Sequence, residues 1–114
     1  SLRDRTKAFA LRIISVFSAL PNSTEAQVMG KQLLRSGTSI GANYREASRA
    51  RSDAEFIAKL GICISELDET SYWLELLIDS KMIPKAKLSS LLTETNELIA
   101  IFTSIVKKRK AIKG

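Results

Sequence analysis

The feature that most constrains the fold is a row of apolar and small residues that recurs in alternating steps of four and three through residues 53–80. The row consists of Phe56, Leu60, Cys63, Leu67, Thr70, Leu74 and Leu77. An α-helix turns once every 3.6 residues, so this spacing places the whole row on one helix face. The stripe predicts one long helix with a buried side.

Two other segments repeat the pattern, residues 2–20 and residues 85–109. The helix of residues 53–80 also has a start signal, because Ser52 and Glu55 have the spacing of a capping box. Pro21 and Pro84 interrupt the chain between segments, as expected for turns.

The segment of residues 24–51 is less regular in composition, because Gly37, Gly41 and several serines lie in its middle. The alternation of four and three nevertheless continues through it, at Ala26, Met29, Leu33, Ser36, Ile40, Asn43 and Ala47. A phosphate-binding loop would need a preceding strand and a Gly-Lys-Ser/Thr sequence, and neither is present. We therefore predict a helix in which Gly30, Gly37 and Gly41 lie along one side and admit a close neighbour.

Four amphipathic segments joined by short connections predict an all-α protein with a single domain over residues 1–114. The expected architecture is an up-down-up-down antiparallel four-helix bundle. Its helices are expected at about 2–20, 24–51, 53–80 and 85–109. The basic C-terminal tail, residues 107–114, is expected to fray.

The absence of histidine restricts the chemistry. It removes Ser-His-Asp triads, most zinc sites and the Glu-x-x-His metal sites of helical bundles. We therefore expect no enzyme activity, no metal and no cofactor. Cys63 is the single cysteine, which excludes an internal disulfide and is typical of the cytoplasm. No apolar run approaches the roughly 18 residues of a membrane span, and no secretory signal opens the chain, so we expect a cytoplasmic protein with no membrane partner.

Charge is distributed unevenly along the chain, whose formal net charge is +6. Residues 53–80 carry seven acidic side chains and one lysine, whereas the segments on either side are basic. An acidic helix beside basic ones offers opposite charges for a head-to-tail assembly, in which one face meets a different face of the next subunit.

Three motifs resemble a known bacterial family of four-helix bundles. They are Arg35-Ser-x-Thr-Ser-Ile-x-x-Asn-x-x-Glu-Ala47, Glu55-Phe56-(x)3-Leu60, and Ser65-Glu-Leu-x-Glu-Thr70 with Tyr72-Trp-Leu-x-Leu-Leu77. The founding members of this family are encoded by intervening sequences within large-subunit ribosomal RNA genes. The resemblance covers nearly the whole chain.

The resemblance implies a ring-shaped homopentamer. A related branch is the accessory variability determinant of diversity-generating retroelements, which is a basic pentameric barrel that binds nucleic acid and the retroelement reverse transcriptase. The motifs here are more similar to those of the intervening-sequence branch, for which no catalytic activity is established.

Basic residues on two helices are candidates for nucleic-acid contact, because cations that follow one helix face or form a terminal block often bind phosphates. The alternatives for the helix of residues 24–51 are ion pairs with the acidic helix of a neighbouring subunit and a solvated face. The candidates are Lys31, Arg35, Arg45, Arg49, Lys107, Lys108, Arg109 and Lys110.

Polar residues on the apolar stripes are assigned a structural role, because buried polar groups need partners. We expect Asn43, with Ser39, to bond across to Glu66, Glu69 or Thr70 and to fix the register of the bundle; Ser36 also lies on the apolar stripe and is assigned to the same polar core. Residues of the acidic segment 53–80 that lie at the edge of its apolar stripe or outside it are candidates for a subunit interface. These are Glu66, Asp68, Tyr72, Trp73 and Glu75.

The sequence thus favours a non-enzymatic, ring-forming protein that binds nucleic acid, RNA in preference, through basic faces. The alternative is an interaction module whose partner is another protein, including a reverse transcriptase.

Overall fold

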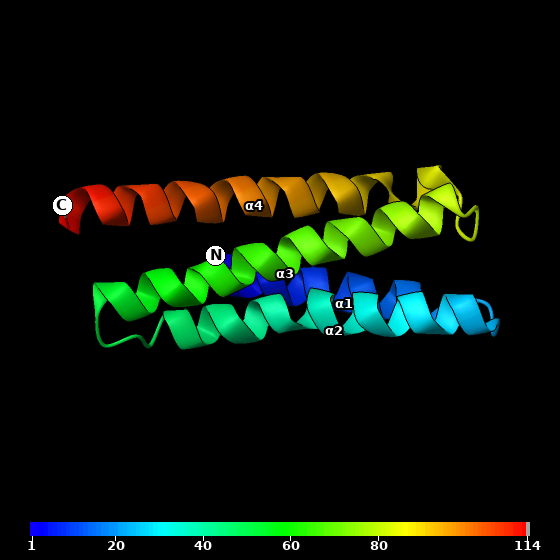
Figure 1. Ribbon diagram of the computed structural model, residues 1–114, viewed down its shortest axis with the longest axis horizontal. Helices are drawn as coiled ribbons and strands as arrows, with labels where there is room; N and C mark the ends of the chain where they lie inside the picture. Colours follow the sequence, from blue (N-terminus) through cyan, green and yellow to red (C-terminus); the bar gives the residue numbers. More distant parts are fainter. Residues whose placement is uncertain (114) are drawn as a thin grey trace.

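The computed structural model describes residues 1–113 and contains four helices connected by short turns (Figure 1). They are α1 (Leu2–Ser18), α2 (Thr24–Ala47), α3 (Asp53–Asp79) and α4 (Lys85–Lys113). No strand occurs in this part of the chain, and consecutive helices run in opposite directions along a molecule of 49 × 21 × 20 Å. The all-helical fold predicted from the spacing is confirmed.

The core follows the predicted stripes. On α3 the stripe residues from Leu60 to Leu77 are buried, and Phe56 is half-buried. Each of the other helices contributes large side chains to the same core. These include Phe9 and Ile13 of α1, Leu33 and Ile40 of α2, and Leu98 and Phe102 of α4.

The helix ends differ from the predicted ones. The first helix ends at Ser18 instead of residue 20, and α2 ends at Ala47 instead of residue 51. Ser52 is the N-cap of α3 and has an extended backbone, so α2 must end before it. Ser52 Oγ accepts from the amide of Glu55, but the Glu55 carboxylate accepts from the amide of Arg51, so the capping box is not reciprocal.

The C-terminal tail, which was predicted to fray, is helical up to Lys113. Gly114 lies outside the described residues. Arg109 explains the difference. Its Nη1 lies 2.8 Å from Oδ1 of Asp53 on α3, and its guanidinium lies 4.0 Å from the centre of the Phe56 ring. These contacts attach the last turns of α4 to the start of α3.

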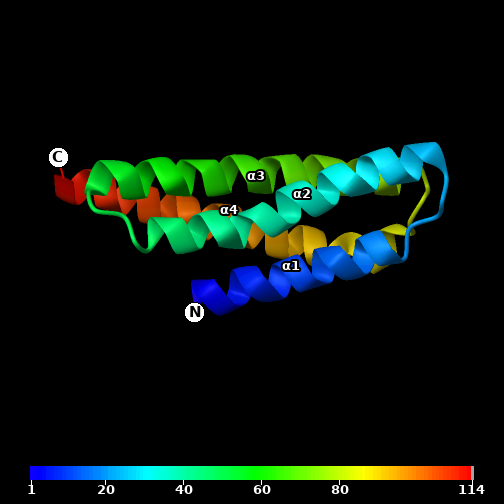
Figure 2. The same cartoon turned by 90° about the horizontal axis from the view of Figure 1, so that it is seen from below.

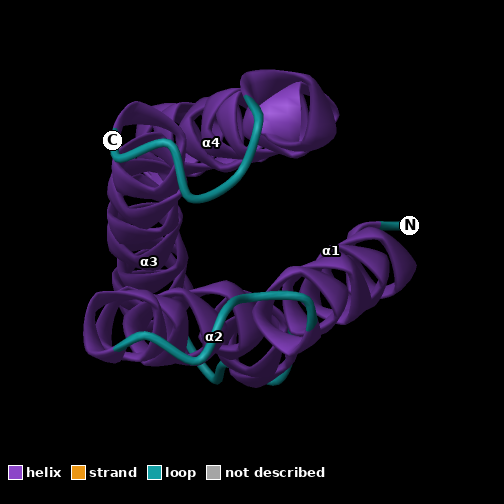
Figure 3. Ribbon diagram, turned by 90° about the vertical axis from the view of Figure 1, so that its right-hand side faces the viewer, coloured by secondary structure: helices purple, strands orange, loops and turns teal. Residues whose placement is uncertain are grey.

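The seam between α1 and α4 is the weakest contact of the bundle. Seen end on, the ribbons of α1 and α4 lie on opposite sides of an open arrangement (Figure 3), and the N-terminal turns of α1 diverge from the other helices (Figure 2). Two long side chains cross the seam. Arg5 makes a bidentate bond with Glu94, with both distances 2.7 Å, and Arg12 donates to Ser90 Oγ at 2.7 Å.

The Arg5–Glu94 pair predicts a pH-dependent contribution to stability. The hydrogen bond from Arg5 holds the pKa of Glu94 below its usual value. The carboxylate therefore stabilises the fold above the unfolded pKa of about 4.3, and this contribution is lost as the pH falls through the lower pKa of the folded state. In urea unfolding, Glu94→Gln should lower the midpoint at pH 7, and the deficit should shrink as the pH falls below about 4.

Glu97 is the matched control, because its carboxylate is more exposed and lies 3.5 Å from Arg5. Glu97→Gln should cost less at pH 7. A deficit for Glu94→Gln that is equal at pH 7 and pH 3 would contradict the assigned role of the ion pair.

Candidate nucleic-acid interface

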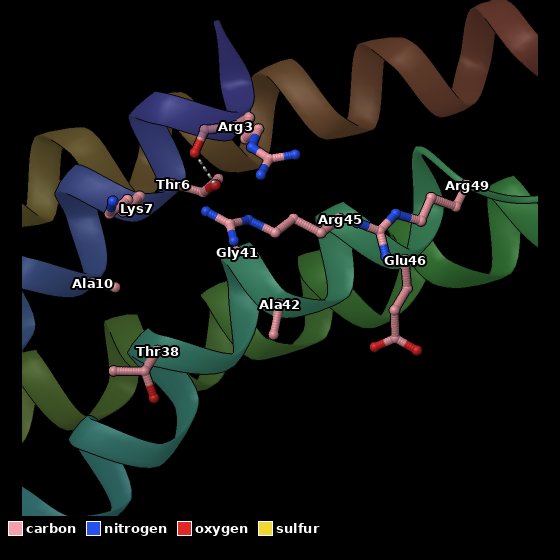
Figure 4. Close-up of a pocket in the computed structure, with 10 residues that line it drawn as sticks. All are labelled: Arg3, Thr6, Lys7, Ala10, Thr38, Gly41, Ala42, Arg45, Glu46 and Arg49. Carbon is pink, nitrogen blue, oxygen red and sulfur yellow. Dashed lines mark hydrogen bonds between the residues drawn. The ribbon is translucent and has the colours of Figure 1, made fainter.

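A groove of about 470 Å³ lies between the N-terminal half of α1 and the C-terminal half of α2 (Figure 4). Three of the residues that line it, Ala10, Gly41 and Ala42, have only a methyl group or no side chain and leave the space between the helices open. At Gly41 a Cβ atom would lie 3.2 Å from Thr6 Oγ1, so even a methyl group would press against α1. The complete lining consists of Arg3, Thr6, Lys7 and Ala10 of α1 and Thr38, Gly41, Ala42, Arg45, Glu46 and Arg49 of α2.

Four cations border the groove, two from each helix: Arg3 and Lys7 on α1, and Arg45 and Arg49 on α2. Within each pair the residues are one helical turn apart, which brings them to the same face. The Arg45 side chain extends toward Thr6 of α1 (Figure 4). Among the described residues, none of the four is within ion-pair distance of a carboxylate.

The single carboxylate of the lining does not neutralise this charge. Glu46 points away from the groove (Figure 4), and its Oε1 accepts from Nζ of Lys59 on α3 at 3.1 Å. The two threonines are also occupied, because Thr6 and Thr38 donate to the backbone oxygens of Leu2 and Leu34. The groove therefore presents free positive charge, which is suited to an anion.

Two of the predicted contact residues of α2 lie elsewhere. Lys31 is exposed but does not line the groove. Arg35 faces α3, where it pairs with Glu66 at 3.1 Å and with Glu69. Glu69 also accepts from Trp73 Nε1 at 3.1 Å. This hydrogen bond is the largest cause that lowers the pKa of Glu69, and the hydrogen bond and charge of Arg35 lower it further. Arg35 is thus held by its own chain.

The candidate contact residues of α4 are likewise partly exposed and partly paired within the chain. Lys107, Lys108 and Lys110 are exposed, whereas Arg109 is paired with Asp53. The end of α4 lies at the same end of the bundle as the end of α2 (Figure 1). The three lysines therefore extend the positive charge at that end.

Besides the ion pairs of Arg35 and Glu46, two serines of α2 make hydrogen bonds to α3. The hydroxyls of Ser36 and Thr70 lie 2.9 Å apart in the core, and Ser39 Oγ donates to Glu66 Oε2 at 2.6 Å. The bond that we expected from Asn43 to the third helix is not formed. Its amide donates to the backbone oxygen of Ser39 within α2, at 2.9 Å, because the half-buried side chain reaches its own helix first.

The candidate interface residues lie in two settings on α3. Asp68, Tyr72 and Glu75 are exposed, and Tyr72 retains 53% of its surface. Glu66 and Trp73 are half-buried and engaged within the chain, Trp73 also packing edge-on against Tyr72 with ring centres 5.1 Å apart. The exposed three remain available for another subunit.

The groove also includes Arg3 and Lys7, which were not selected as candidates from the sequence. Their spacing of four residues already indicated that they lie on the same face of a helix. The sequence could not show that this face of α1 is turned toward the basic part of α2, because that depends on how the two helices are rotated against each other.

Cys63 offers no reactive thiol. It is buried, its Sγ donates to the backbone oxygen of Ile40 at 3.6 Å, and burial raises its pKa to about 11. Thiols of this kind are inert at neutral pH. Within residues 1–113 no cluster of three potential ligands for a metal ion occurs, and no helix is long and apolar enough to cross a membrane.

Comparisons with known proteins agree with the fold. The family model described as 23S rRNA-intervening sequence protein matches residues 2–104. The chain is also similar to a crystal structure of a protein with unknown function from the S23 ribosomal protein family of Bacteroides thetaiotaomicron VPI-5482. The two share 45% sequence identity with a TM-score of 0.88, over 94% of this chain and 99% of that one. No curated protein matches the chain.

Proposed function

Because the chain belongs to the family of 23S rRNA-intervening sequence proteins, we propose that it is a non-enzymatic protein that binds RNA in the basic groove between α1 and α2. The observation that carries the proposal is a set of four cations around this groove that have no carboxylate partner in the part of the chain that the structure describes. Elsewhere Arg5, Arg35, Lys59 and Arg109 are neutralised by carboxylates of the same chain. Unpaired cations on both walls of a groove are the electrostatic signature of a phosphate-binding surface.

The experiment is an RNA titration at several salt concentrations. Each phosphate that is neutralised releases counterions, so the logarithm of the affinity for a structured RNA should fall against the logarithm of salt with a slope of about −3.6 for four contacts. Electrophoretic mobility shifts with a structured RNA measure this slope. A slope near zero, or no shift at low salt, would remove the proposal and favour the alternative partner, a protein such as a reverse transcriptase.

We also propose that the chain assembles into a ring-shaped homopentamer through the exposed face of α3. Asp68, Tyr72 and Glu75 supply negative charge and an exposed aromatic ring on this face, and Lys31 of α2 and the lysines at the end of α4 supply the opposite charge. A head-to-tail ring needs two such unlike surfaces. The family resemblance suggests five subunits.

Light scattering at low and high salt tests this assembly. The mass should correspond to five chains at low salt and should decrease at high salt, because exposed opposite charges are screened. The double variant Asp68→Lys/Glu75→Lys should reduce the mass at low salt. A mass of one chain under all conditions, or an oligomer that neither salt nor the variant affects, would refute this interface.

A further inference from the structure

The chemistry of the groove lining limits what part of a nucleic acid it can contact. Its polar side chains are cations, one carboxylate turned away and two threonines whose hydroxyls donate to backbone oxygens. Neither an amide side chain, which would read adenine, nor an aromatic ring, on which a base would stack, occurs among its ten lining residues. The groove therefore offers cations suited to phosphates and, among its lining residues, no ring on which an unpaired base could stack.

The aromatic residues of the chain are committed elsewhere. Phe9 and Phe102 are fully buried, Tyr44 packs against Phe102 with ring centres 5.7 Å apart, and Phe56 lies beneath Arg109. Phe17 packs against the core.

The two remaining rings, Tyr72 and Trp73, lie on the acidic helix α3. Trp73 donates to Glu69, and Tyr72 lies between the acidic positions Asp68 and Glu75 on the same exposed face. Negative charge there repels phosphates. Proteins that hold single strands combine a basic groove with aromatic platforms, and here the two features are on different surfaces.

The arrangement of the cations suits a continuous phosphate backbone. Arg3 and Lys7 follow one wall of the groove, and Arg45 and Arg49 follow the other, each pair separated by roughly 6 Å along its helix. A strand that passes between the walls meets positive charge on both sides. In a double helix the bases are already stacked and paired, so the lack of base contacts carries no cost.

We propose that the groove binds the phosphate backbone of a double-helical nucleic acid without preference for base sequence. This proposal rests on the function proposed above. Single strands bind more weakly, because their unstacked bases find no platform beside the cations.

The test compares three RNAs of equal length, and therefore of equal phosphate number, by fluorescence anisotropy with the intact protein at one salt concentration. They are a hairpin, the same hairpin with its stem sequence scrambled and re-paired, and an unstructured strand. A DNA hairpin forms a fourth arm. We expect the two RNA hairpins to agree within about threefold and the unstructured strand to bind about tenfold more weakly, the size of roughly one lost stacking contact.

Each outcome decides between the two proposals. Binding of the DNA hairpin supports a duplex ligand recognised by its backbone. If the unstructured strand binds as tightly as the hairpins, or scrambling the stem changes the affinity tenfold, the duplex inference is wrong while RNA binding stands. If no polynucleotide binds at low salt, the proposed function fails, and the duplex inference with it.

Discussion

Reversing the charge of Arg45 and Arg49 together is expected to lower the affinity for RNA by about a hundredfold at low salt, or roughly 2.8 kcal/mol. Both side chains border the groove and neither is paired with a carboxylate among the described residues. The variant Arg45→Glu/Arg49→Glu therefore removes two phosphate contacts and places two negative charges beside the RNA. Its salt slope should also be smaller by about two, one for each lost contact.

The matched control is Lys85→Glu/Lys87→Glu, which lowers the net charge by the same amount. Lys85 and Lys87 are exposed and lie in the first turn of α4, far along the bundle from the groove (Figure 1). Glutamate is favourable at a helix N-terminus, so the fold should be retained. We expect a loss of less than about threefold, since charges beyond a Debye length are screened.

Circular dichroism of both double variants should show unchanged helicity. Equal losses of RNA affinity in the two variants would mean that net charge alone governs binding. The groove would then not be the site.

The helices could be predicted from the sequence because periodicity is a local property. The alternation through Ser36, Ile40 and Asn43 predicted a continuous helix in spite of Gly37 and Gly41, and α2 is continuous there. The end of α4 could not be predicted in this way. It depends on Arg109 meeting Asp53 and Phe56, which are more than fifty residues away in the chain.

The basic face of α2 shows why the residues of the groove could be predicted only in part from the sequence. Arg35 and Arg49 are two heptads apart, and a straight helix rotates by about 20° per heptad relative to an exact seven-residue repeat. Residues that form one row in the sequence thus lie about 40° apart around the helix. Arg35 lies on the side of α3, where carboxylates pair with it, whereas Arg49 lies on the side of α1.

Helix α3 shows that the net charge of a segment does not reveal which of its charges are free to bind a partner. Its net negative charge suggested contacts with a neighbouring subunit, yet Glu66 and Glu69 pair with Arg35 of the same chain. The composition gives the net charge of a helix but does not show which of its charged side chains form ion pairs within the same chain. Asp68 and Glu75 are exposed, as is Asp79, and they have no ion-pair partner among the described residues, so they remain for a partner.

Alanine substitutions at two helical glycines should have opposite effects on stability. Gly37 is buried where α2 meets α1, and a Cβ atom there would lie 2.7 Å from Cγ1 and 2.9 Å from Cγ2 of Ile13. Ile13 is fully buried and branched at Cβ, so it cannot turn aside, and the two helices must separate. Such overpacking costs about 1–3 kcal/mol.

Gly61 is the matched control in the middle of α3, since a Cβ atom there has no neighbour within 4 Å. Gly61→Ala should raise the free energy of unfolding by about 0.5–1 kcal/mol, because alanine favours the helix. Gly37→Ala gains the same helix preference but suffers the clash, so it should be less stable than Gly61→Ala by about 1–3 kcal/mol.

Urea unfolding at equal protein concentration measures this difference, with the oligomeric mass checked for each variant because Gly61 lies on the exposed side of α3. Equal stabilities of the two alanine variants would show that α1 can move away from α2 at no cost. Glycine would then not be needed for the close contact between these helices. A difference of the expected size would instead show that Gly37 is needed for the close approach of α2 to Ile13 of α1.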